Sequence, residues 1–541
     1  MSDARHSADD PRRAPAPARV ADAPSDYPGG MRPLAESMAA LREIAATPAV
    51  AALAAAFSEA GHEFALVGGP VRDALLGRPV TDLDFTTSAR PEQTREIVAG
   101  LTKQIWEVGR DYGTIAAKVQ GETVEITTYR ADTYRDDSRK PEVAFGDSIE
   151  GDLVRRDFTI NALALMLPEL RLVDVGAAGE GASGGIEDLL AARIVTPGAP
   201  ETSFTDDPLR MLRAARFAAQ LGFEVAPEVQ AAMVEFGPRL EIISAERIRD
   251  ELVKLLSTDD PVPGVRLLVD TGLAERFLPE LTALLATQDD HGRHKDVYEH
   301  SLTVLRQAIE LERERSKPRV AESRTESGHS DGLDDRAPTP ELGEGPEAGP
   351  DIVLRLAALL HDIGKPATRR FERGGVTFHH HDVVGAKLAR KRLRALRFDN
   401  DTVKRVSRLI ELHLRFFGYS DQQWTDSAVR RYVRDAGDEL EQLHILTRAD
   451  VTTRNRRKAE RLEHAYDDIE RRIAELAEAE ELAAVRPELD GAQIMELLGL
   501  KPGPEVGRAY RFLLELRLDE GPIGEEAAAE RLRAWYAEQS A

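Results

Sequence analysis

The period of the hydrophobic pattern changes partway along the chain, and this change limits the possible folds more than any other feature. Between about residues 33 and 150, short apolar or alternating segments such as GTIAAKVQ and VEITTYR are separated by helical patterns, which indicates a mixed sheet with helices. From about residue 160 to the end the pattern is almost entirely helical, as in AERIRDELVKLL. A chain of 541 residues also needs several separate cores. We therefore expect an α+β fold, with an α/β head followed by a long all-α body.

Two polar stretches lack any hydrophobic period. Residues 1–32 are rich in Ala, Pro, Asp and Arg, and residues 316–350 separate two helical patterns. Neither stretch can bury enough apolar surface to offset the chain entropy lost on folding, so we expect a disordered tail and a disordered insertion. The expected domains are the tail at 1–32, the head at 33–165, a helical neck and body at 166–290, a second helical domain at 291–465 that contains the insertion, and a C-terminal helical region at 466–541.

The composition excludes several classes of protein. The chain has no cysteine, and therefore no disulfide, thiolate zinc site or cysteine nucleophile, which suits a reducing compartment. It also has no run of about 18 uncharged apolar residues and no apolar stretch typical of a secretory signal at its N-terminus. We expect a cytoplasmic protein without a membrane partner.

The charge is unevenly distributed along the chain. The formal net charge is -23, yet residues 361–460 carry 22 Lys and Arg against 14 Asp and Glu. Such a basic region is what a protein needs to hold a phosphate backbone. A solvated basic helix face would give the same count.

The first motif, GGPVRDALLGRPVTDLDF, spans residues 68–85. Gly68 and Gly69 follow an apolar strand and precede a helix, so their backbone N–H groups are free to face an anion at the helix N-terminus. The alternative is a tight turn from strand to helix without a ligand. The pattern is not GxGxxG, so a dinucleotide-binding fold is not implied.

Three carboxylates near this motif predict a metal site. Asp82 and Asp84 project from one face of a strand, and two like charges held this close are costly without a cation between them. Oxygen ligands beside an anion-binding turn suit two-metal nucleotidyl transfer, in which the two Mg²⁺ ions lie about 4 Å apart. Glu125 is the candidate third carboxylate, because Val124 and Ile126 point to the opposite face of its strand. A solvent-facing glutamate is the alternative.

Three segments together resemble a known family: GGPVRDALLGRPVTDLDFTT, LVRRDFTINALAL at 153–165 and DDPLRMLRAARFAAQLGF at 206–223. They are similar to the successive motifs of the class II CCA-adding tRNA nucleotidyltransferases, a family shared with bacterial poly(A) polymerases. The resemblance implies a nucleotidyltransferase-type head and Mg²⁺ bound by Asp82 and Asp84. The nucleotide contacts that it implies are Gly69, Arg72, Arg156, Asp157, Arg213 and Arg216.

The third of these segments contains the family's base-reading pattern EDxxR as Asp206, Asp207 and Arg210. Asp207 and Arg210 share one helix face, and they supply an acceptor and a donor. Cytosine and adenine each present an amino donor beside an unprotonated ring nitrogen, whereas guanine and uracil present the reverse order. The pair therefore accepts C and A and rejects G and U. The alternative is that these aspartates only cap a helix, and Asp206 departs from the family glutamate.

The segment VGRDYGTI at 108–115 separates two readings of the resemblance. Poly(A) polymerases of this family carry a basic stretch close to GRRF after the metal aspartates. Here Asp111 stands where a basic residue would be expected, which favours the CCA-adding reading.

A second constellation consists of His300, His361 and Asp362 in LLHDIGK, and Asp450. It resembles the HD phosphohydrolase superfamily, in which these positions bind a metal and intervening histidines, here His381 and His413, extend the site. Imidazole and carboxylate ligands together suit Mn, Ni, Co or Zn. The alternative is that these are unrelated core or surface histidines. Whether an HD site here is catalytic stays open.

The resemblances predict a template-independent enzyme that adds CCA to the 3′ end of tRNA with CTP and ATP, by two-metal nucleotidyl transfer. Its expected partners are tRNA, CTP and ATP. The alternatives are a poly(A) polymerase, or an HD phosphohydrolase with a degenerate nucleotide-binding head. Intact Asp82, Asp84, Arg156 and Asp207 favour the first, because a degenerate head would have lost some of them. Partial addition of CC or A, accessory HD hydrolysis and the oligomeric state stay open.

Overall fold

The computed structural model describes residues 33–106, 113–131, 144–176, 183–289, 295–316, 349–372, 375–416, 419, 424–452, 456–480 and 486–539. The expected tail at 1–32, most of the expected insertion at 316–350 and Asp111 lie outside these residues. The chain divides into two compact units. The first contains residues 1–243 and 263–273, and the second contains residues 244–262 and 274–541.

The first unit is built on a seven-stranded sheet with the order β3-β4-β5-β2-β1-β8-β9. Its strands are β1 (Phe64–Val67), β2 (Leu83–Thr87), β3 (Ile105–Trp106), β4 (Thr114–Val119), β5 (Glu122–Thr128), β8 (Leu163–Leu167) and β9 (Arg171–Asp174). All neighbours pair antiparallel except β2 and β5, which are parallel. This one parallel pair aligns the start of β2 with the middle of β5.

Helices pack on both faces of the sheet. On one face Phe57 of α2 (Pro48–Glu59) stacks on Phe64, which stacks in turn on Phe85, with ring centroids 4.5 and 4.7 Å apart. On the other face Ile149 and Leu153 of α5 (Ile149–Val154) pack in a buried cluster with small and branched residues of β1 and β8. The alternation of side chains along each strand separates these two cores.

The other elements of the first unit are mostly short helices. They are α1 (Leu34–Ala45), α3 (Gly69–Leu76), α4 (Pro91–Ala99), α6 (Gly185–Leu190), α7 (Pro200–Asp206), α8 (Leu209–Leu221), α9 (Pro227–Phe236) and α11 (Val262–Asp270), with the two-residue strands β6 (Arg130–Ala131), β7 (Ala144–Phe145), β10 (Arg193–Ile194) and β11 (Glu224–Val225). Helix α8 ends at Gly222, whose φ of +71° stops the helix without strain.

The second unit is almost entirely helical. Its helices are α10 (Ala245–Leu256), α12 (Leu273–Phe277), α13 (Pro279–Thr282), α14 (Val297–Ser316), α15 (Ile352–Leu360), α16 (Lys365–Thr368), α17 (His381–Ala395), α18 (Asn400–Leu412), α20 (Asp426–Ala436), α21 (Leu440–Ala449), α22 (Arg456–Glu480), α23 (Gly491–Leu498), α24 (Pro504–Glu520) and α25 (Glu525–Gln539). Two hairpins interrupt them: β12 (Gln288–Asp289) with β13 (Lys295–Asp296), and β14 (Arg370–Glu372) with β15 (Gly375–Thr377).

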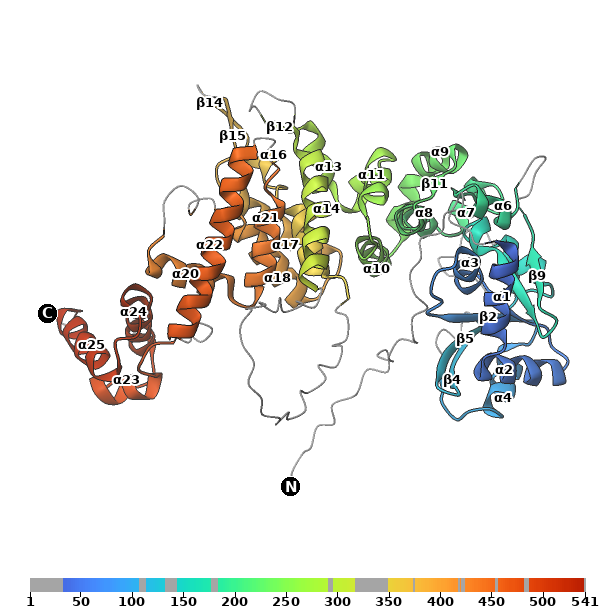
Figure 1. The fold of residues 1–541 in the computed structure, drawn as a ribbon, viewed down its shortest axis with the longest axis horizontal. Coiled ribbons are helices and arrows are strands. Elements are labelled where there is room, and N and C mark those ends of the chain that lie inside the picture. The colour runs from blue at the N-terminus through green and yellow to red at the C-terminus, as the bar shows by residue number, and fades with distance from the viewer. Residues whose placement is uncertain are drawn as a thin grey trace, which may run out of the picture. The chain divides into compact units, whose positions relative to one another are not determined.

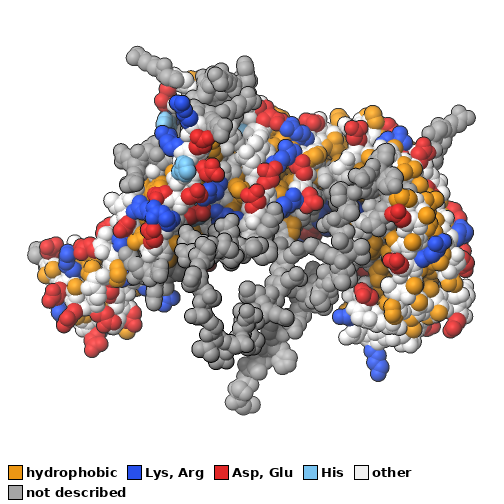
Figure 2. Space-filling view, viewed as in Figure 1, with side chains coloured by type: hydrophobic (Ala, Val, Ile, Leu, Met, Phe, Trp, Pro, Cys, Tyr) orange, Lys and Arg blue, Asp and Glu red, His pale blue; other side chains and the backbone are white. Residues whose placement is uncertain are grey.

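The helices α14, α15, α17, α18 and α21 pack against one another in the second unit, and Figure 1 shows α14, α17, α18 and α21 lying close together. The helices α23, α24 and α25 form a separate small core around Ile494, Leu513 and Leu532. Acidic side chains are spread over the visible face of these C-terminal helices (Figure 2). The expected α+β head followed by a mostly helical body is confirmed.

The described helices were compared with the length and hydropathy that a membrane span requires. No single helix in the described ranges is long and apolar enough to cross a membrane. Helices α1 and α2 reach the required length and hydropathy only as a pair, and they are bent by 77° relative to each other.

Candidate active site and metal centre

A cleft of about 270 Å³ in the first unit, here called the head cleft, gathers most of the residues that the sequence singled out. They come from the turn before α3, from β2, from the segment after α5 and from α8, so residues up to about 150 positions apart meet in one place. The predicted residues that line the head cleft are Gly69, Arg72, Asp82, Asp84, Arg156, Asp157, Arg213 and Arg216. Glu125, Asp207 and Arg210 are not among the described residues that line it.

The glycine turn at the start of α3 depends on the absence of a side chain at Gly68. Gly68 has φ +76°, a conformation that L-residues with a Cβ rarely adopt. A Cβ at Gly68 would also lie 2.9 Å from Nη1 of Arg156. The glycines therefore do form a tight turn from strand to helix. The same turn also lines the head cleft and lets the Arg156 guanidinium approach the backbone.

The predicted carboxylates meet at the edge of the head cleft. Asp84 on β2 lies directly beside Glu125 on β5 in the parallel register, at a strand spacing of about 4.8 Å. Burial, the neighbouring Glu125 and Asp82 raise the pKa of Asp84 to about 6, although Arg156 opposes the shift. Three carboxylates of this kind fit a divalent cation, because a cation would remove the repulsion that makes Asp84 hard to ionise.

A chain of hydrogen bonds links the glycine turn to α8. Both terminal nitrogens of Arg72 are engaged: its Nε and Nη2 donate to the Asp73 carboxylate at 2.9 Å each, and its Nη1 donates to Oδ1 of Asn161 at 2.6 Å. Asn161 then donates from Nδ2 to Asp157 at 3.0 Å. Arg213 completes the chain by donating from Nε to the other oxygen of Asp157 at 2.7 Å. Each side chain in the cleft is therefore oriented by the next.

The charge of Asp157 is stabilised by this arrangement. Burial alone would raise its pKa, but Arg213 and the hydrogen bond from Asn161 outweigh burial and hold that pKa well below its usual range. Asp157 is thus an ionised acceptor in the floor of the cleft at neutral pH.

The ring of Phe217 supports three of the arginines. The guanidinium carbons of Arg72, Arg213 and Arg216 lie 5.2, 5.4 and 4.1 Å from its ring centroid, within the range of cation–π attraction. The sequence reasoning did not single out Phe217, Asn161 or Asp73. For Phe217 the signal was available, because residues 213, 216, 217 and 220 share one face of a helix.

The proposed base-reading pair lies at the junction of α7 and α8. The Asp207 carboxylate accepts a hydrogen bond from the Leu209 N–H at 3.1 Å, as the capping alternative expects. Arg210 donates to Ser203 Oγ at 2.9 Å and to the backbone carbonyl of Arg155 at 2.5 Å. Since a guanidinium has five N–H groups, these two bonds orient Arg210 and leave further donors.

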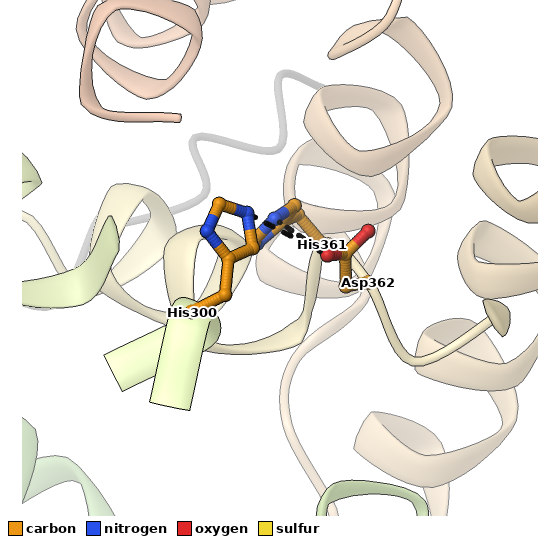
Figure 3. Close-up of side chains that lie close together, drawn as sticks. All are labelled: His300, His361 and Asp362. Carbon is orange, nitrogen blue, oxygen red and sulfur yellow. Dashed lines mark ion pairs between the residues drawn. The ribbon is translucent and has the colours of Figure 1, made fainter. Parts of the chain in front are cut away.

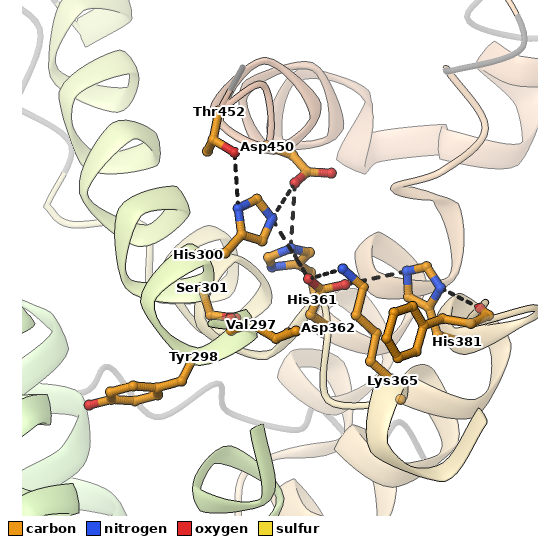
Figure 4. A network of polar contacts seen from close by, with 12 residues as sticks. Val297, Tyr298, His300, Ser301, His361, Asp362, Lys365, His381, Asp450 and Thr452 are labelled. Atoms are coloured by element: carbon orange, nitrogen blue, oxygen red, sulfur yellow. Dashed lines mark hydrogen bonds and ion pairs between the residues drawn. The ribbon is translucent and has the colours of Figure 1, made fainter. Parts of the chain in front are cut away.

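In the second unit, six predicted residues come together in what we call the His/Asp cluster, and Figures 3 and 4 label all of them except His413. Its members are His300, His361, Asp362, His381, His413 and Asp450. Apart from His300, which lies within α14, each stands at a helix end: His361 and Asp362 follow α15, His381 begins α17, His413 follows α18 and Asp450 follows α21. The structure therefore brings these four histidines and two aspartates to one place.

The carboxylates of the His/Asp cluster lie between the imidazoles. His300 Nε2 is 2.8 Å from Asp450 Oδ1 and 3.7 Å from Asp362 Oδ2. His361 Nε2 is 3.3 Å from Asp362 Oδ2, and His381 Nε2 is 3.3 Å from the other oxygen, Oδ1. Asp362 therefore offers one carboxylate oxygen to each side of the cluster, and two groups of three ligands, His300–His361–Asp362 and Asp362–His381–His413, share it.

Backbone carbonyls fix the orientation of three imidazoles. The Nδ1 atoms of His361, His381 and His413 contact the carbonyl oxygens three residues earlier, at 2.9, 2.8 and 2.6 Å. Since a carbonyl only accepts, each Nδ1 carries a proton and Nε2 faces the cluster, where it can bind a cation whenever it is not itself protonated. This is the outer-shell arrangement that metal-ligating histidines require.

The electrostatics of the His/Asp cluster fit divalent cations. Burial and the neighbouring His361 lower the pKa of His413 to about 4, and its buried Nε2 has no hydrogen-bond partner among the described residues. Burial alone would lower the pKa of His361, but Asp362 and Asp450 raise it to about 10. Two buried carboxylates require a positive charge nearby, and either a proton on His361 or a cation can supply it.

Lys365 is a further residue of this site that the sequence reasoning missed. Its Nζ lies 2.8 Å from Asp362 Oδ2 and 5.6 Å from the ring centroid of Phe378. Its position three residues after Asp362 could have indicated this contact from the sequence. An ammonium group here gives the site a fixed positive charge beside the shared ligand.

Comparison with known proteins defines the class to which this fold and these sites belong. Three family models match in order: a poly(A) polymerase head domain at residues 64–194, a probable RNA- and SrmB-binding site of polymerase A at 222–285, and an HD domain at 297–455. The first unit thus contains a nucleotidyltransferase head, and the second contains an HD domain.

Two curated relatives cover nearly the whole chain. The CC-adding tRNA nucleotidyltransferase of Thermus thermophilus is 31% identical over 86% of this chain and 92% of its own length. The A-adding tRNA nucleotidyltransferase of Deinococcus radiodurans is 32% identical over 87% and 94%. A CCA-adding enzyme of Bacillus stearothermophilus, solved with CTP, has the same fold with a TM-score of 0.57 at 23% identity, over 94% of this chain and all of that one. The chain belongs to the tRNA nucleotidyltransferase family.

We predict that Gly68→Ala weakens nucleotide binding by displacing Arg156. The matched control is Gly61→Ala, because Gly61 has the same φ of +76° but no atom within 4 Å of an added Cβ. Both variants should lose about 1–2 kcal/mol of stability from the left-handed backbone. Only Gly68→Ala should also lose affinity in a titration with a nucleoside triphosphate, and equal affinities in the two variants would contradict this role of Arg156.

Proposed function

We propose that this protein adds the nucleotides C, C and A to the 3′ end of tRNA, with CTP and ATP as substrates and no nucleic-acid template. The observation that carries the proposal is the head cleft, where Asp82 and Asp84 lie beside four arginines and Glu125 stands next to Asp84 on the neighbouring strand. A nucleoside triphosphate needs both, since its phosphates carry negative charge and its transfer develops more. A tRNA substrate supports a cytoplasmic location for this reaction.

Different residues in and beside the head cleft would perform different steps of the reaction. Asp82, Asp84 and Glu125 would hold Mg²⁺, which when bound stabilises charge on the attacking and leaving oxygens. In the reaction the 3′ oxygen of the tRNA forms a bond to the α-phosphorus of the triphosphate, and pyrophosphate leaves. Arg72 and Arg156 sit beside the glycine turn, where the phosphates would bind. Their fixed orientation means that little reorganisation is needed when the charge develops.

Other residues would position the nucleoside. Asp157, kept ionised by Arg213, is an acceptor for a ribose hydroxyl. Asp207 and Arg210 would read the base edge, and the bonds of Arg210 to Ser203 and to the Arg155 carbonyl fix the direction of its remaining donors. An acceptor next to a donor matches the amino group and ring nitrogen of both C and A.

The His/Asp cluster supports a second activity, hydrolysis of a phosphoester. The observation that favours it is that two sets of three ligands share Asp362. A mixed imidazole and carboxylate set suits Mn, Ni, Co or Zn better than Mg²⁺. Such a cation lowers the pKa of bound water and so supplies a nucleophile at neutral pH.

The first prediction here concerns the carboxylates of the head. Asp84→Asn and Glu125→Gln should lower nucleotide addition to tRNA that lacks its 3′ end, by about a hundredfold or more for Asp84, since metal contacts contribute several kcal/mol. Glu122→Gln is the matched control, because Glu122 is exposed on the same strand β5, away from Asp84. Product length, measured on gels with CTP, ATP or both, also separates CCA addition from CC or A addition. Unchanged turnover in Asp84→Asn would remove this site from the mechanism.

A second prediction concerns base selection. Asp207→Asn keeps an oxygen acceptor for the Leu209 N–H, so the start of α8 should stay intact, but its amide can present a donor to the base. Selectivity for C and A over G and U should fall by roughly 1–3 kcal/mol, or about 5- to 150-fold. The measurement is single-turnover incorporation of all four nucleotides. Wild-type selectivity in a folded variant would leave Asp207 as a cap only.

A third prediction is that the His/Asp cluster binds two metal ions independently of the head. His413→Gln should bind one ion instead of two, and Asp362→Asn should bind none tightly, because Asp362 belongs to both ligand sets. His464→Gln, on the exposed side of α22, is the control. Metal content after dialysis against Mn²⁺ or Ni²⁺ gives the stoichiometry. Nucleotide addition with Mg²⁺ should persist in all three variants, and its loss in a folded variant would show that the two sites act in one reaction.

A further inference from the structure

Helix α17 carries four basic residues on one face, which we call the basic stripe: Lys387, Arg390, Lys391 and Arg394. Their spacing of i, i+3, i+4 and i+7 puts them side by side on a helix. The residues of α17 that pack into the unit, among them Ala386, Ala389 and Leu393, are buried on another face. Lys387, Lys391 and Arg394 are exposed, and Arg390 is half-buried. The excess of positive charge in residues 361–460 is therefore partly concentrated on one helix surface.

The basic stripe lacks the ion pairs that several neighbouring arginines make. No ion pair joins its four side chains to an acidic residue in the part of the chain that the structure describes. By contrast, Arg392 on the same helix binds Glu280 through two nitrogens at 2.8 and 3.0 Å, and Arg405 on α18 binds Glu439 at 2.7 Å.

Four unpaired cations are unexpected in a chain with a net charge of -23. Like charges at i and i+4 on a helix repel each other and destabilise it by a few tenths of a kcal/mol per pair. A polyanion bound along the face removes this repulsion and releases its own counterions. The stripe thus has the properties of a binding surface for a phosphate backbone rather than of a solvated helix face.

We propose that the basic stripe of α17 binds the phosphodiester backbone of the tRNA, an inference that rests on the proposed function. Helix α17 begins at His381, a member of the His/Asp cluster, and the stripe starts six residues later, about 9 Å along the helix axis. The stripe therefore lies on the element that also reaches the candidate phosphoester centre. RNA helices are recognised largely through backbone and shape, and a row of Lys and Arg supplies that contact without reading sequence. The matched RNA-binding model, at residues 222–285, does not include α17.

The test is the full-length triple variant Lys387→Gln, Lys391→Gln and Arg394→Gln, in which glutamine preserves helix propensity. Its affinity for tRNA is measured over a series of salt concentrations. Loss of three phosphate contacts should make the slope of log affinity against log salt shallower by about 2 to 3. We also expect KM for tRNA to rise about tenfold or more, while kcat at saturating tRNA stays unchanged, because no member of the head cleft is altered.

The matched control is Lys501→Gln, Arg511→Gln and Arg533→Gln. It removes the same charge from exposed positions in the C-terminal helices, where residues 487–541 carry 11 acidic and 6 basic side chains. This variant should bind tRNA with the wild-type slope and affinity. Circular dichroism of both variants establishes that they are folded, and the exposure of all six positions makes unfolding unexpected.

Three outcomes overturn the proposal: a wild-type salt slope in the stripe variant, an equal loss in the control variant, or a loss of affinity for anionic lipid vesicles without a loss for tRNA. Failure of the proposed function gives a different result. In that case the wild-type protein adds no nucleotides to tRNA, whereas the difference in salt slope between the two variants still measures whether the stripe binds the backbone.

Discussion

Both candidate sites of this protein contain clustered carboxylates, and these carboxylates need a positive counter-charge. In the head, Asp84 and Glu125 are held side by side by the parallel pairing of β2 with β5, and burial together with the neighbouring Glu125 raises the pKa of Asp84 to about 6. In the helical unit, Asp362 is buried among imidazoles, and Asp450 lies 2.8 Å from His300. Neither arrangement is stable without cations nearby, because a buried unpaired carboxylate is costly. Arginine and protonated histidine supply part of this positive charge, and divalent metals would supply the rest.

The two sites hold their carboxylates on different local structures, and this difference determines which metals and ligands they suit. The head uses oxygen ligands at the start of a strand beside a glycine turn, which suits Mg²⁺ and a triphosphate. The His/Asp cluster uses helix ends, where the carbonyl three residues before each of three histidines fixes its ring. Under the proposed function, the first arrangement would bind a substrate with its metal, whereas the second would bind metals independently of any substrate. The two activities are therefore separable in principle, although they occur in one chain.

The hydrogen-bond chain from Arg72 through Asn161 and Asp157 to Arg213 gives the head cleft its rigidity. It joins helix α3 to helix α8, and Phe217 packs against the guanidinium groups at both ends. A change in any member would therefore alter the orientation of the others. This explains why residues that the sequence reasoning passed over, such as Asn161 and Phe217, are as well placed for function as the residues that it named.

The sequence by itself determined the fold class and the family and named the candidate site residues, because hydrophobic period and ordered motifs are local properties of a chain. It identified Asp82, Asp84, Glu125 and all six members of the His/Asp cluster. Only the tertiary structure decided which side chains touch. It placed Glu125 next to Asp84 through a strand register, put Asp207 and Arg210 outside the lining of the head cleft, and showed that Asp362 serves two ligand sets. It also showed that the basic residues of α17 lack partners whereas Arg392 has one. Register, burial and pairing depend on contacts between distant segments, and a pattern along one chain does not specify them.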